Sequence, residues 1–482
     1  MLLACGPAAA SRDGLEPCRI KGLAQDALCG QVRRPLDPAQ PQGMQIDVKF
    51  AVLPALARKR KPDPVFFLAG GPGQSAISLA PQMANQFGRL LYRRDLVLID
   101  QRGTGRSAPL RCDDDAPSRP LGDADLRQQL RQIQSCRAAL QKLPHGDLRH
   151  YTTSIAMGDA EAVRQALGAE QVNLVGGSYG TRAALEYLRL FPQRVRRVVI
   201  DGVAPPDMVL PASFSPDAQA AFDAMLLACE GDSLCHQTHG PLRERWQTLL
   251  RSLPRNVRVL HPQTGQEEQF TLTRDMLMAM VRAPLYAPAL ASALPYAIRE
   301  ASDGRFTPLV GLAGSLGGGR SGPARLAMGM HFSVICAEDM PAMDAGAGES
   351  PGKDFGDGLA LLYRQTCKDW PRGKVPPAFY RIQESAAPVL VLSGGADPVT
   401  PPRHGERVAR ALGPHARHVV VPEAGHGVMG LPCMRDVLFR FLDAPDAVAA
   451  AAVEAACAAG IPRPKAFRPV RPQRAAAEET RP

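Results

Sequence analysis

Short apolar runs that end in glycine, alternating with helix-forming segments, constrain the fold of this chain more than any other feature. The runs at 64–70, 95–103 and 171–177 are continuously apolar, as expected of strands that are covered on both faces. Residues 154–168 and 179–191 have helical spacing between and after such runs. Alternating β and α elements predict a largely parallel sheet with right-handed crossovers.

The strand rhythm stops after the run at 195–203 and returns at 387–395 and 416–427. Residues in between have mainly helical patterns, so we expect a helical insertion between two parts of one sheet. Two independent domains are the alternative, which is weaker because neither strand set closes a sheet alone. The expected organisation is an N-terminal segment, a core in two parts, an inserted cap and a C-terminal tail, at 1–17, 18–212, 213–375, 376–446 and 447–482.

The stretch Gly176-x-Ser178-x-Gly180 stands at a predicted strand-to-helix turn. A serine on such a turn is held in a strained backbone conformation, where larger neighbours would clash. The helix that follows presents free N–H groups and a positive dipole end to an oxyanion. The motif alone is weak, because most serines in glycine-rich loops are only loop residues. Its position makes Ser178 the expected nucleophile.

A nucleophilic serine needs a base and an orienting acid further along the chain. Asp397 follows one late strand run and His426 follows the next, so both should lie at the same edge of the sheet. Each alone could be an ordinary loop residue. Their joint order predicts a Ser-Asp-His triad; the reserve bases, less well placed, are His331, His404 and His418.

An oxyanion hole needs two donors. The backbone N–H of Tyr179, directly after the serine, supplies the first. The second is expected from the glycine-rich stretch at 69–73, which follows a strand and allows close approach of backbone to a substrate. Gly71 is the favoured donor and Gly70 the runner-up.

Together the stretches GGPG (70–73), DQRGTGRS (100–107), GGSYGTR (176–182), GGADPVTP (394–401) and GHG (425–427) resemble the α/β-hydrolase serine peptidases of the proline iminopeptidase and tripeptidyl aminopeptidase type, particularly the secreted bacterial branch. The resemblance runs from about Cys29 to about Cys433. It implies an α/β-hydrolase fold with a helical cap, and peptide substrates with a free N-terminus. One departure is Ala69, where proline iminopeptidases usually have histidine; this favours the tripeptidyl-like branch.

Recognition of a substrate ammonium requires an anionic group in a partly desolvated cap. Glu338 and Asp339, beside Cys336, resemble the acidic cap segment of related aminopeptidases, and Gly70 would also border the substrate. The alternative for the two acids is a solvated acidic turn. We expect no metal or organic cofactor.

Two other functions remain open from the sequence. The same triad cleaves esters, so a carboxylesterase or lipase-like hydrolase is the alternative enzyme. A non-catalytic binding protein of the envelope is a third hypothesis, against which the complete triad argues.

The cysteines bear on the compartment. Apart from Cys5, ten of them fall into neighbouring couples along the chain, which suggests five short-loop disulfides and an oxidising compartment. A cytosolic enzyme with buried thiols is the alternative, and no zinc-type CxxC pair occurs. The couples are Cys18 with Cys29, Cys112 with Cys136, Cys229 with Cys235, Cys336 with Cys367, and Cys433 with Cys457.

Residues 2–5 resemble the end of a bacterial lipoprotein signal, in which the cysteine is lipidated, although the basic and long apolar regions that normally precede it are missing. We therefore expect export to the periplasm, the cell envelope or the medium, with a lipid anchor on Cys5 as an open question. No apolar run is long enough to span a bilayer.

The net charge of +10 does not indicate nucleic-acid binding, because the basic residues are thinly spread and aromatic residues make up only 5% of the chain. The densest basic stretch, 462–474, is rich in proline and predicts a solvated tail, with contact to an anionic envelope surface as the alternative.

Overall fold

The computed structural model describes residues 12–112, 126–262, 264–315, 325–347 and 349–469. Its strands are β1 (Glu16–Cys18), β2 (Ala27–Pro35), β3 (Gln45–Leu53), β4 (Val65–Leu68), β5 (Leu96–Ile99), β6 (Val172–Gly177), β7 (Val195–Asp201), β8 (Arg255–Leu260), β9 (Glu267–Leu272), β10 (Val389–Gly394) and β11 (Ala416–Val421). Within these residues nine strands form one sheet in the order β1-β2-β3-β5-β4-β6-β7-β10-β11. From β5 to β11 neighbouring strands are parallel, as the alternating pattern predicted, while β1 to β3 form an antiparallel edge.

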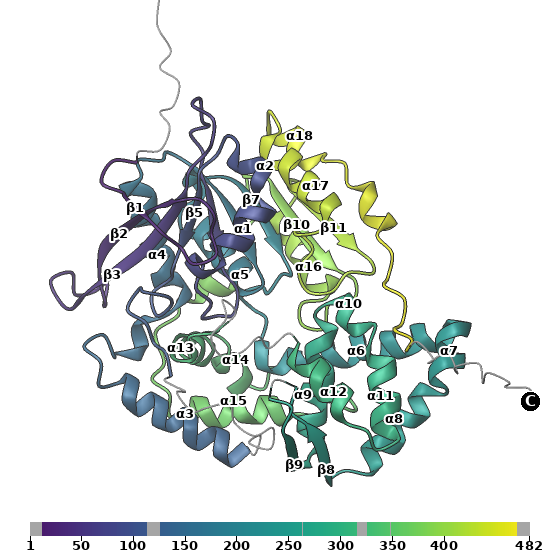
Figure 1. Cartoon of the computed structure of the whole chain (residues 1–482). Helices are drawn as coiled ribbons and strands as arrows, with labels where there is room; N and C mark the ends of the chain where they lie inside the picture. Colours follow the sequence, from purple (N-terminus) through teal and green to yellow (C-terminus); the bar gives the residue numbers. More distant parts are fainter. Residues whose placement is uncertain (1–11, 113–125, 263, 316–324, 348, 470–482) are drawn as a thin grey trace, which may run out of the picture.

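Helices cover both faces of this sheet (Figure 1). One face packs against α4 (Thr153–Ala166), α5 (Tyr179–Leu190) and α16 (Pro402–Leu412). The other packs against α1 (Ala80–Gln86), α2 (Gly88–Leu91), α17 (Pro432–Asp443) and α18 (Ala447–Ala451). Strands β4, β5 and β10 are buried along their whole length because they have helices on both sides.

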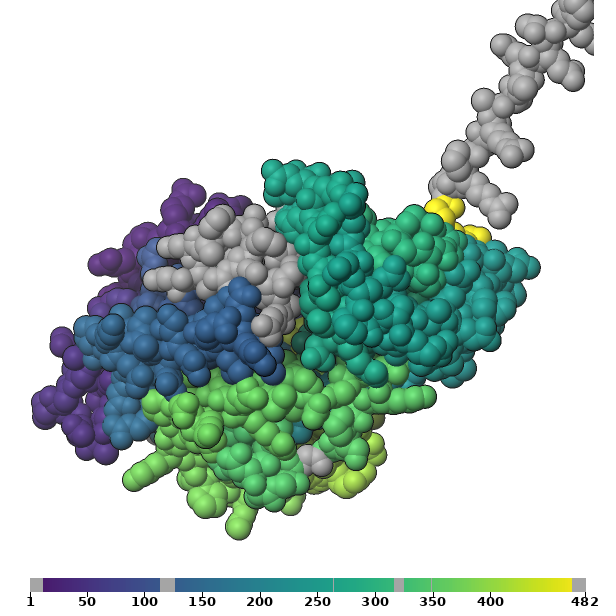
Figure 2. Space-filling model, turned by 90° about the horizontal axis from the view of Figure 1, so that it is seen from below, coloured from purple at the N-terminus to yellow at the C-terminus, as the bar shows by residue number. Residues whose placement is uncertain are grey.

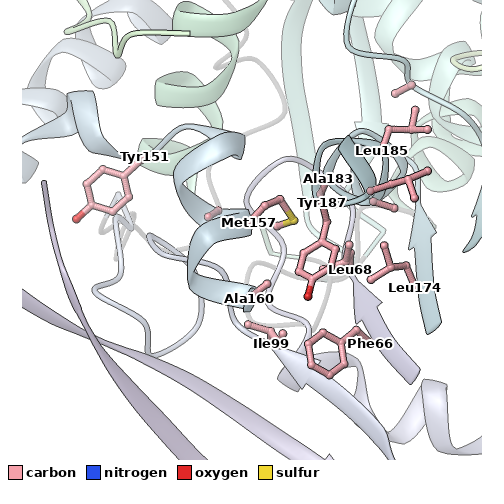
Figure 3. Packing of buried hydrophobic residues seen from close by; sticks show 14 of the residues in the cluster. Phe66, Leu68, Ile99, Tyr151, Met157, Ala160, Leu174, Ala183, Leu185 and Tyr187 are labelled. Carbon is pink, nitrogen blue, oxygen red and sulfur yellow. The ribbon is translucent and has the colours of Figure 1, made fainter. Parts of the chain in front are cut away.

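The core under α4 and α5 is built from alternating small and large side chains. Figure 3 shows Met157 and Ala160 of α4 on one side of Tyr187 of α5 and Leu174 of β6 on the other, with Phe66 of β4 below them. All five side chains are buried, at 0% exposure. This packing fixes the start of α5, where Ser178 lies, against the ends of the central strands.

The insertion between β7 and β10 has two parts rather than one cap. The first part, here called the helical lobe, covers residues 210–314 and encloses its own core around Phe222 and Trp246. Its elements are α6 (Leu210–Gly231), α7 (Ser233–His239), α8 (Leu242–Arg251), the β8–β9 hairpin, α9 (Arg274–Leu285), α10 (Pro288–Ala291), α11 (Leu294–Ser302) and α12 (Thr307–Gly314).

The second part of the insertion belongs to the main core. Helices α13 (Met328–Glu338), α14 (Met340–Asp344) and α15 (Gly358–Asp369) lie below the sheet with α3 (Leu126–Leu140) (Figure 1). Phe332, Ile335 and Cys367 of this group are buried in the same cluster as the strands and α4. The segment expected as one helical cap, 213–375, is therefore divided between a separate lobe and an extension of the hydrolase core.

The C-terminal segment packs against the sheet before residue 461, whereas the described part of the basic stretch, 462–469, is mostly exposed. Ala450, Val453 and Ala458 are buried against the sheet side that carries α17. Further on, the backbone N–H of Phe467 donates to the Ser292 carbonyl at 2.8 Å, and its ring packs against Tyr296 of the helical lobe. Residues 461–469 thus cross from the sheet to the lobe.

Five disulfides join the cysteines in the neighbouring couples that the sequence suggested, Cys18–Cys29, Cys112–Cys136, Cys229–Cys235, Cys336–Cys367 and Cys433–Cys457. Cys5 lies outside the described residues. Among the residues that are described, no helix is both long and apolar enough to cross a membrane.

Candidate active site

Ser178 lies on a sharp turn between β6 and α5, as the sequence predicted. Its φ and ψ angles are 55° and −126°, a conformation that costs a non-glycine residue about 1–3 kcal/mol. The flanking glycines are required by space: a Cβ at Gly176 would lie 2.3 Å from the Gly180 carbonyl oxygen, and one at Gly180 would lie 2.0 Å from that of Leu68. The backbone is therefore fitted to hold a small, partly exposed serine at the edge of the sheet.

His426 and Asp397 form a hydrogen-bonded pair. The His426 Nδ1–H donates to Asp397 Oδ2 at 2.8 Å, which leaves Nε2 of the neutral ring as a proton acceptor. Asp397 is held in turn by the backbone N–H groups of Val399 and Thr400, at 2.8 and 2.9 Å, and by the Thr400 hydroxyl at 2.7 Å. Asp397 is fully buried, and the His426 side chain is 15% exposed.

The electrostatics of this pair favour the charged forms. Burial alone would raise the pKa of Asp397, but His426 and the hydrogen bonds from Thr400 outweigh it and the pKa is lowered. For His426, burial would lower the pKa, but the Asp397 carboxylate raises it overall. The pair can therefore stabilise an imidazolium that forms during a proton transfer.

Asp201, at the end of β7, connects the serine to the histidine loop. Its backbone carbonyl accepts from the Ser178 N–H at 2.9 Å. Its side-chain Oδ2 accepts from the N–H groups of Val428 and Met429, at 2.8 and 2.7 Å, which follow His426 by two and three residues. A Cβ on the next residue, Gly202, would lie 3.1 Å from His426 Cε1. One strand end thus positions both Ser178 and His426.

Asp201 was not among the residues predicted from the sequence. The available signal was an acid at the carboxyl end of a buried strand, at the same edge as Asp397. Burial raises the pKa of Asp201 to about 6, and its Oδ1 has no hydrogen-bond partner among the described residues.

The glycine-rich loop at 70–73 lies against the serine. A Cβ on Gly70 would approach the Ser178 Cβ to 3.2 Å, so Gly70 makes a close backbone approach to this residue. Tyr179 opens α5, where the first N–H groups have no partner within the helix. Gly71 follows Gly70 in this loop and has a φ of +112°, a left-handed conformation that favours glycine.

His331 supports this loop instead of serving as a base. Because a carbonyl only accepts, Nδ1–H of His331 donates to the Pro72 carbonyl at 3.0 Å, and Nε2 accepts from the Tyr363 hydroxyl at 2.7 Å. The other reserve bases are also engaged elsewhere, His404 with Asp217 and His418 with Ser393. His426 is the histidine that the structure pairs with Asp397.

Glu338 and Asp339 differ from the expectation of free acids in a cap. Both are buried at 1% exposure, and they pair with the fully buried guanidinium of Arg182 on α5. Glu338 also accepts from the N–H and hydroxyl of Thr153, and Asp339 from the N–H of Leu210. These contacts occupy both carboxylates and join α13 to α4, α5 and α6. The prediction that the two acids bind a substrate ammonium and the alternative of a solvated acidic turn therefore both differ from the structure.

Burial dominates the titration of this network. It raises the pKa of Glu338 to about 7, although Arg182 and the Thr153 hydrogen bonds act in the opposite direction. Removing any one of the three side chains would leave charged or polar groups in the interior without a partner and destabilise the folded protein.

A cavity of about 780 Å³ lies between the helical lobe and the group formed by α3 and α15. Figure 2 shows a recess on this side, where the teal surface of the lobe meets the green surface of the residues that follow it. Helix α9 forms one wall. Tyr286, one residue beyond α9, accepts the His426 N–H on its carbonyl at 2.9 Å, and its ring packs edge-on against the imidazole.

No group of histidine, cysteine or acidic side chains suited to hold a metal ion occurs among the residues that the structure describes.

Comparisons with known proteins show which families and relatives the chain is similar to. A family model described as "alpha/beta hydrolase fold" matches residues 63–244, and one described as "TAP-like protein" matches residues 353–453. Serine protease Hip1 of Mycobacterium tuberculosis is 29% identical over 437 residues, which cover 82% of each chain. The tripeptidyl aminopeptidase of Streptomyces lividans is 32% identical over 218 residues, 42% of this chain and 41% of its own. The proline iminopeptidase of Neisseria meningitidis is 31% identical over 140 residues, 29% of this chain and 32% of its own.

Proposed function

Because the chain belongs to the α/β-hydrolase family of serine peptidases and aminopeptidases, we propose that it is an exported serine aminopeptidase that cleaves peptides from a free N-terminus. The single observation that carries the catalytic part is the hydrogen-bonded His426–Asp397 pair at the sheet edge where Ser178 stands on its strained turn. The aminopeptidase part is supported by the tripeptidyl aminopeptidase and proline iminopeptidase among the relatives.

In the proposed reaction, Ser178 Oγ bonds to the carbonyl carbon of the scissile peptide and gives its proton to Nε2 of His426. Asp397 keeps the proton of Nδ1 in place and stabilises the imidazolium. The backbone N–H groups of Tyr179 and Gly71 bind the oxyanion, with Gly70 bordering the same space. His426 then protonates the leaving amine, and water, activated by the same histidine, hydrolyses the acyl-serine.

Export is proposed from the five disulfides, because disulfides persist mainly in oxidising compartments. A lipid on Cys5 would hold the enzyme at the envelope, and its absence would leave a released enzyme. Mass spectrometry of the protein purified from its own cells would detect both the disulfides and a diacylglycerol on this cysteine. Free thiols at the ten paired positions would contradict export.

The central test compares Ser178→Ala with a control at a lobe serine, Ser292→Ala, whose hydroxyl bonds only to the backbone of its own turn. The first substitution should reduce kcat/KM by about 10,000-fold or more, as expected when the nucleophile of a triad is removed. The control should keep full activity. A fluorophosphonate should label Ser178 alone, and substantial activity in a folded Ser178→Ala protein would refute the assignment.

A matched set of substrates tests the substrate class. Tripeptidyl-aminomethylcoumarins with a free N-terminus should be cleaved, and their N-acetylated counterparts should not. Cleavage of short acyl esters in preference to both would indicate a carboxylesterase, and cleavage of none would indicate a binding protein.

A further inference from the structure

Arg282 is the basic side chain in the described lining of the cavity between the helical lobe and α15. It stands on α9, and the rest of the lining is mainly apolar or uncharged, including Phe214, Met278 and Leu359. Arg282 is half-buried, and its guanidinium lies 5.5 Å from the centroid of the Phe214 ring.

No carboxylate pairs with Arg282 anywhere in the described part of the chain. Two other arginines of the lobe do have such partners, since Arg274 pairs with Asp354 and Arg299 with Glu300. A guanidinium has five N–H donors in a planar fork that matches a carboxylate, and contact with one aromatic face leaves these donors free. A half-buried cation with free donors is an anion-binding group.

The position of Arg282 brings it close to the proposed reaction centre from two sides. It precedes Tyr286 by one helical turn, and Tyr286 contacts His426 through both its carbonyl and its ring. Tyr363, on the facing helix α15, bonds to His331, which holds the Pro72 carbonyl of the glycine-rich loop. Burial raises the pKa of both Tyr286 and Tyr363, and the charge of Arg282 offsets part of the rise in each, as expected of a guanidinium near both rings.

The opposite end of the same helix face is negative. Asp275 also lines the cavity and precedes Arg282 by seven residues, which is about 10 Å along a helix axis. A carboxylate in the cavity is therefore repelled from the exposed end of α9 and attracted toward the end near His426.

We propose that Arg282 binds a carboxylate of the peptide substrate next to the scissile bond, so that the enzyme prefers peptides that carry a negative charge there. This inference rests on the proposed peptidase function. The carboxylate can come from two sources, the C-terminus of a short leaving peptide or the side chain of an aspartate or glutamate that flanks the cleaved bond. Both present the same planar anion to the guanidinium.

The test uses the full chain and four peptides of one sequence, measured at pH 7, where carboxylates are ionised. One pair has a free or an amidated C-terminus one or two residues after the scissile bond. The other pair has glutamate or glutamine beside that bond, with the C-terminus amidated. In the unmodified enzyme kcat/KM should be about 10- to 100-fold higher for the charged member of at least one pair, the range expected for a charged hydrogen bond.

Arg282→Met keeps the stem of the side chain and should abolish this preference by slowing the charged peptide while leaving the neutral peptide within about threefold. Arg282→Lys keeps the charge but loses the fork, and should retain a reduced preference. The control is Arg251→Met on α8, an exposed arginine that donates to the Thr248 hydroxyl on its own helix. This substitution removes the same charge outside the cavity and should change cleavage of neither peptide.

The pair that shows the preference identifies the source of the carboxylate. Equal kcat/KM for charged and neutral peptides in the unmodified enzyme, or an equal loss on both peptides in Arg282→Met, would overturn the proposed subsite. The peptidase assignment would still stand in that case, provided that cleavage depended on Ser178. Failure to cleave any of the four peptides would overturn the peptidase assignment and the subsite together.

Discussion

Replacing Asp201 by asparagine should change the pH dependence of stability in a way that follows directly from its burial. The pKa of Asp201 is raised from 3.8 to about 6, chiefly because the carboxylate is buried. A tenfold change in proton affinity corresponds to about 1.4 kcal/mol, so ionising Asp201 costs on the order of 3 kcal/mol more in the folded protein than in the unfolded chain.

The sign follows from which state holds the proton more tightly. Between about pH 4 and pH 6 the folded protein keeps a proton on Asp201 that the unfolded chain has released, so stability falls as the pH rises through this window. Asp201→Asn removes this contribution. The free energy of unfolding of the variant relative to the unmodified protein should therefore increase by on the order of 3 kcal/mol from pH 4 to pH 7.

Chemical denaturation at the two pH values, with disulfides intact, measures this difference. Asp436→Asn is the control, because Asp436 is an exposed carboxylate paired with Arg440 on the surface of α17. A difference between Asp201→Asn and the unmodified protein that stays constant with pH would refute the reasoning.

The same substitution reports on the position of His426. Asparagine keeps an oxygen that can accept from the N–H groups of Val428 and Met429, but it lacks the charge that helps to raise the pKa of His426. The acid limb of the kcat/KM profile should move to lower pH with the plateau largely kept. Asp201→Ala removes the acceptor as well and should lower the plateau; equal plateaus in the two variants would show that the bonds to this loop do not position the histidine.

Two further substitutions test the supports of the site. Arg182→Met leaves Glu338 and Asp339 buried without their cation and should destabilise the fold by about 3–5 kcal/mol, measured as a lower melting temperature. Arg410→Met, which removes the exposed partner of the exposed Glu406 on α16, should cost less than about 1 kcal/mol. A small effect at Arg182 would contradict the buried network. Tyr363→Phe removes the hydroxyl that orients His331 beneath the glycine-rich loop and should lower kcat by about 10-fold with little change in KM, while Tyr92→Phe at an exposed site should have no effect; a change confined to KM would place Tyr363 in substrate binding instead.

The strands that carry the site were predictable because each is a short apolar run followed at once by a polar residue or glycine. Asp397 and His426 could be placed at one edge from chain order alone, since the carboxyl ends of parallel strands meet there. The β8–β9 hairpin was missed because its strands are half exposed, with Val257 and Val259 as the buried positions of β8. This pattern gives a weak signal beside helical neighbours.

Contacts between segments that are distant in the sequence could not be predicted from it. The partner of Glu338 is Arg182, 156 residues earlier, and no local pattern connects them. Two adjacent acidic residues have the same sequence pattern whether they contact a substrate or a buried guanidinium. Residues 461–469 were expected as a tail because proline and arginine are typical of solvated segments, yet Phe467 finds an aromatic partner on the helical lobe.

The order of the disulfides has a consequence for how the chain matures. Every described cysteine is bonded to its neighbour in the cysteine order, across separations of 6 to 31 residues. A chain oxidised progressively from its C-terminus meets each native partner before any competitor, and a chain oxidised from its N-terminus does so once Cys5 is set aside. Correct pairing therefore needs no prior assembly of the sheet, and the loss of one couple leaves no orphan thiol among the others.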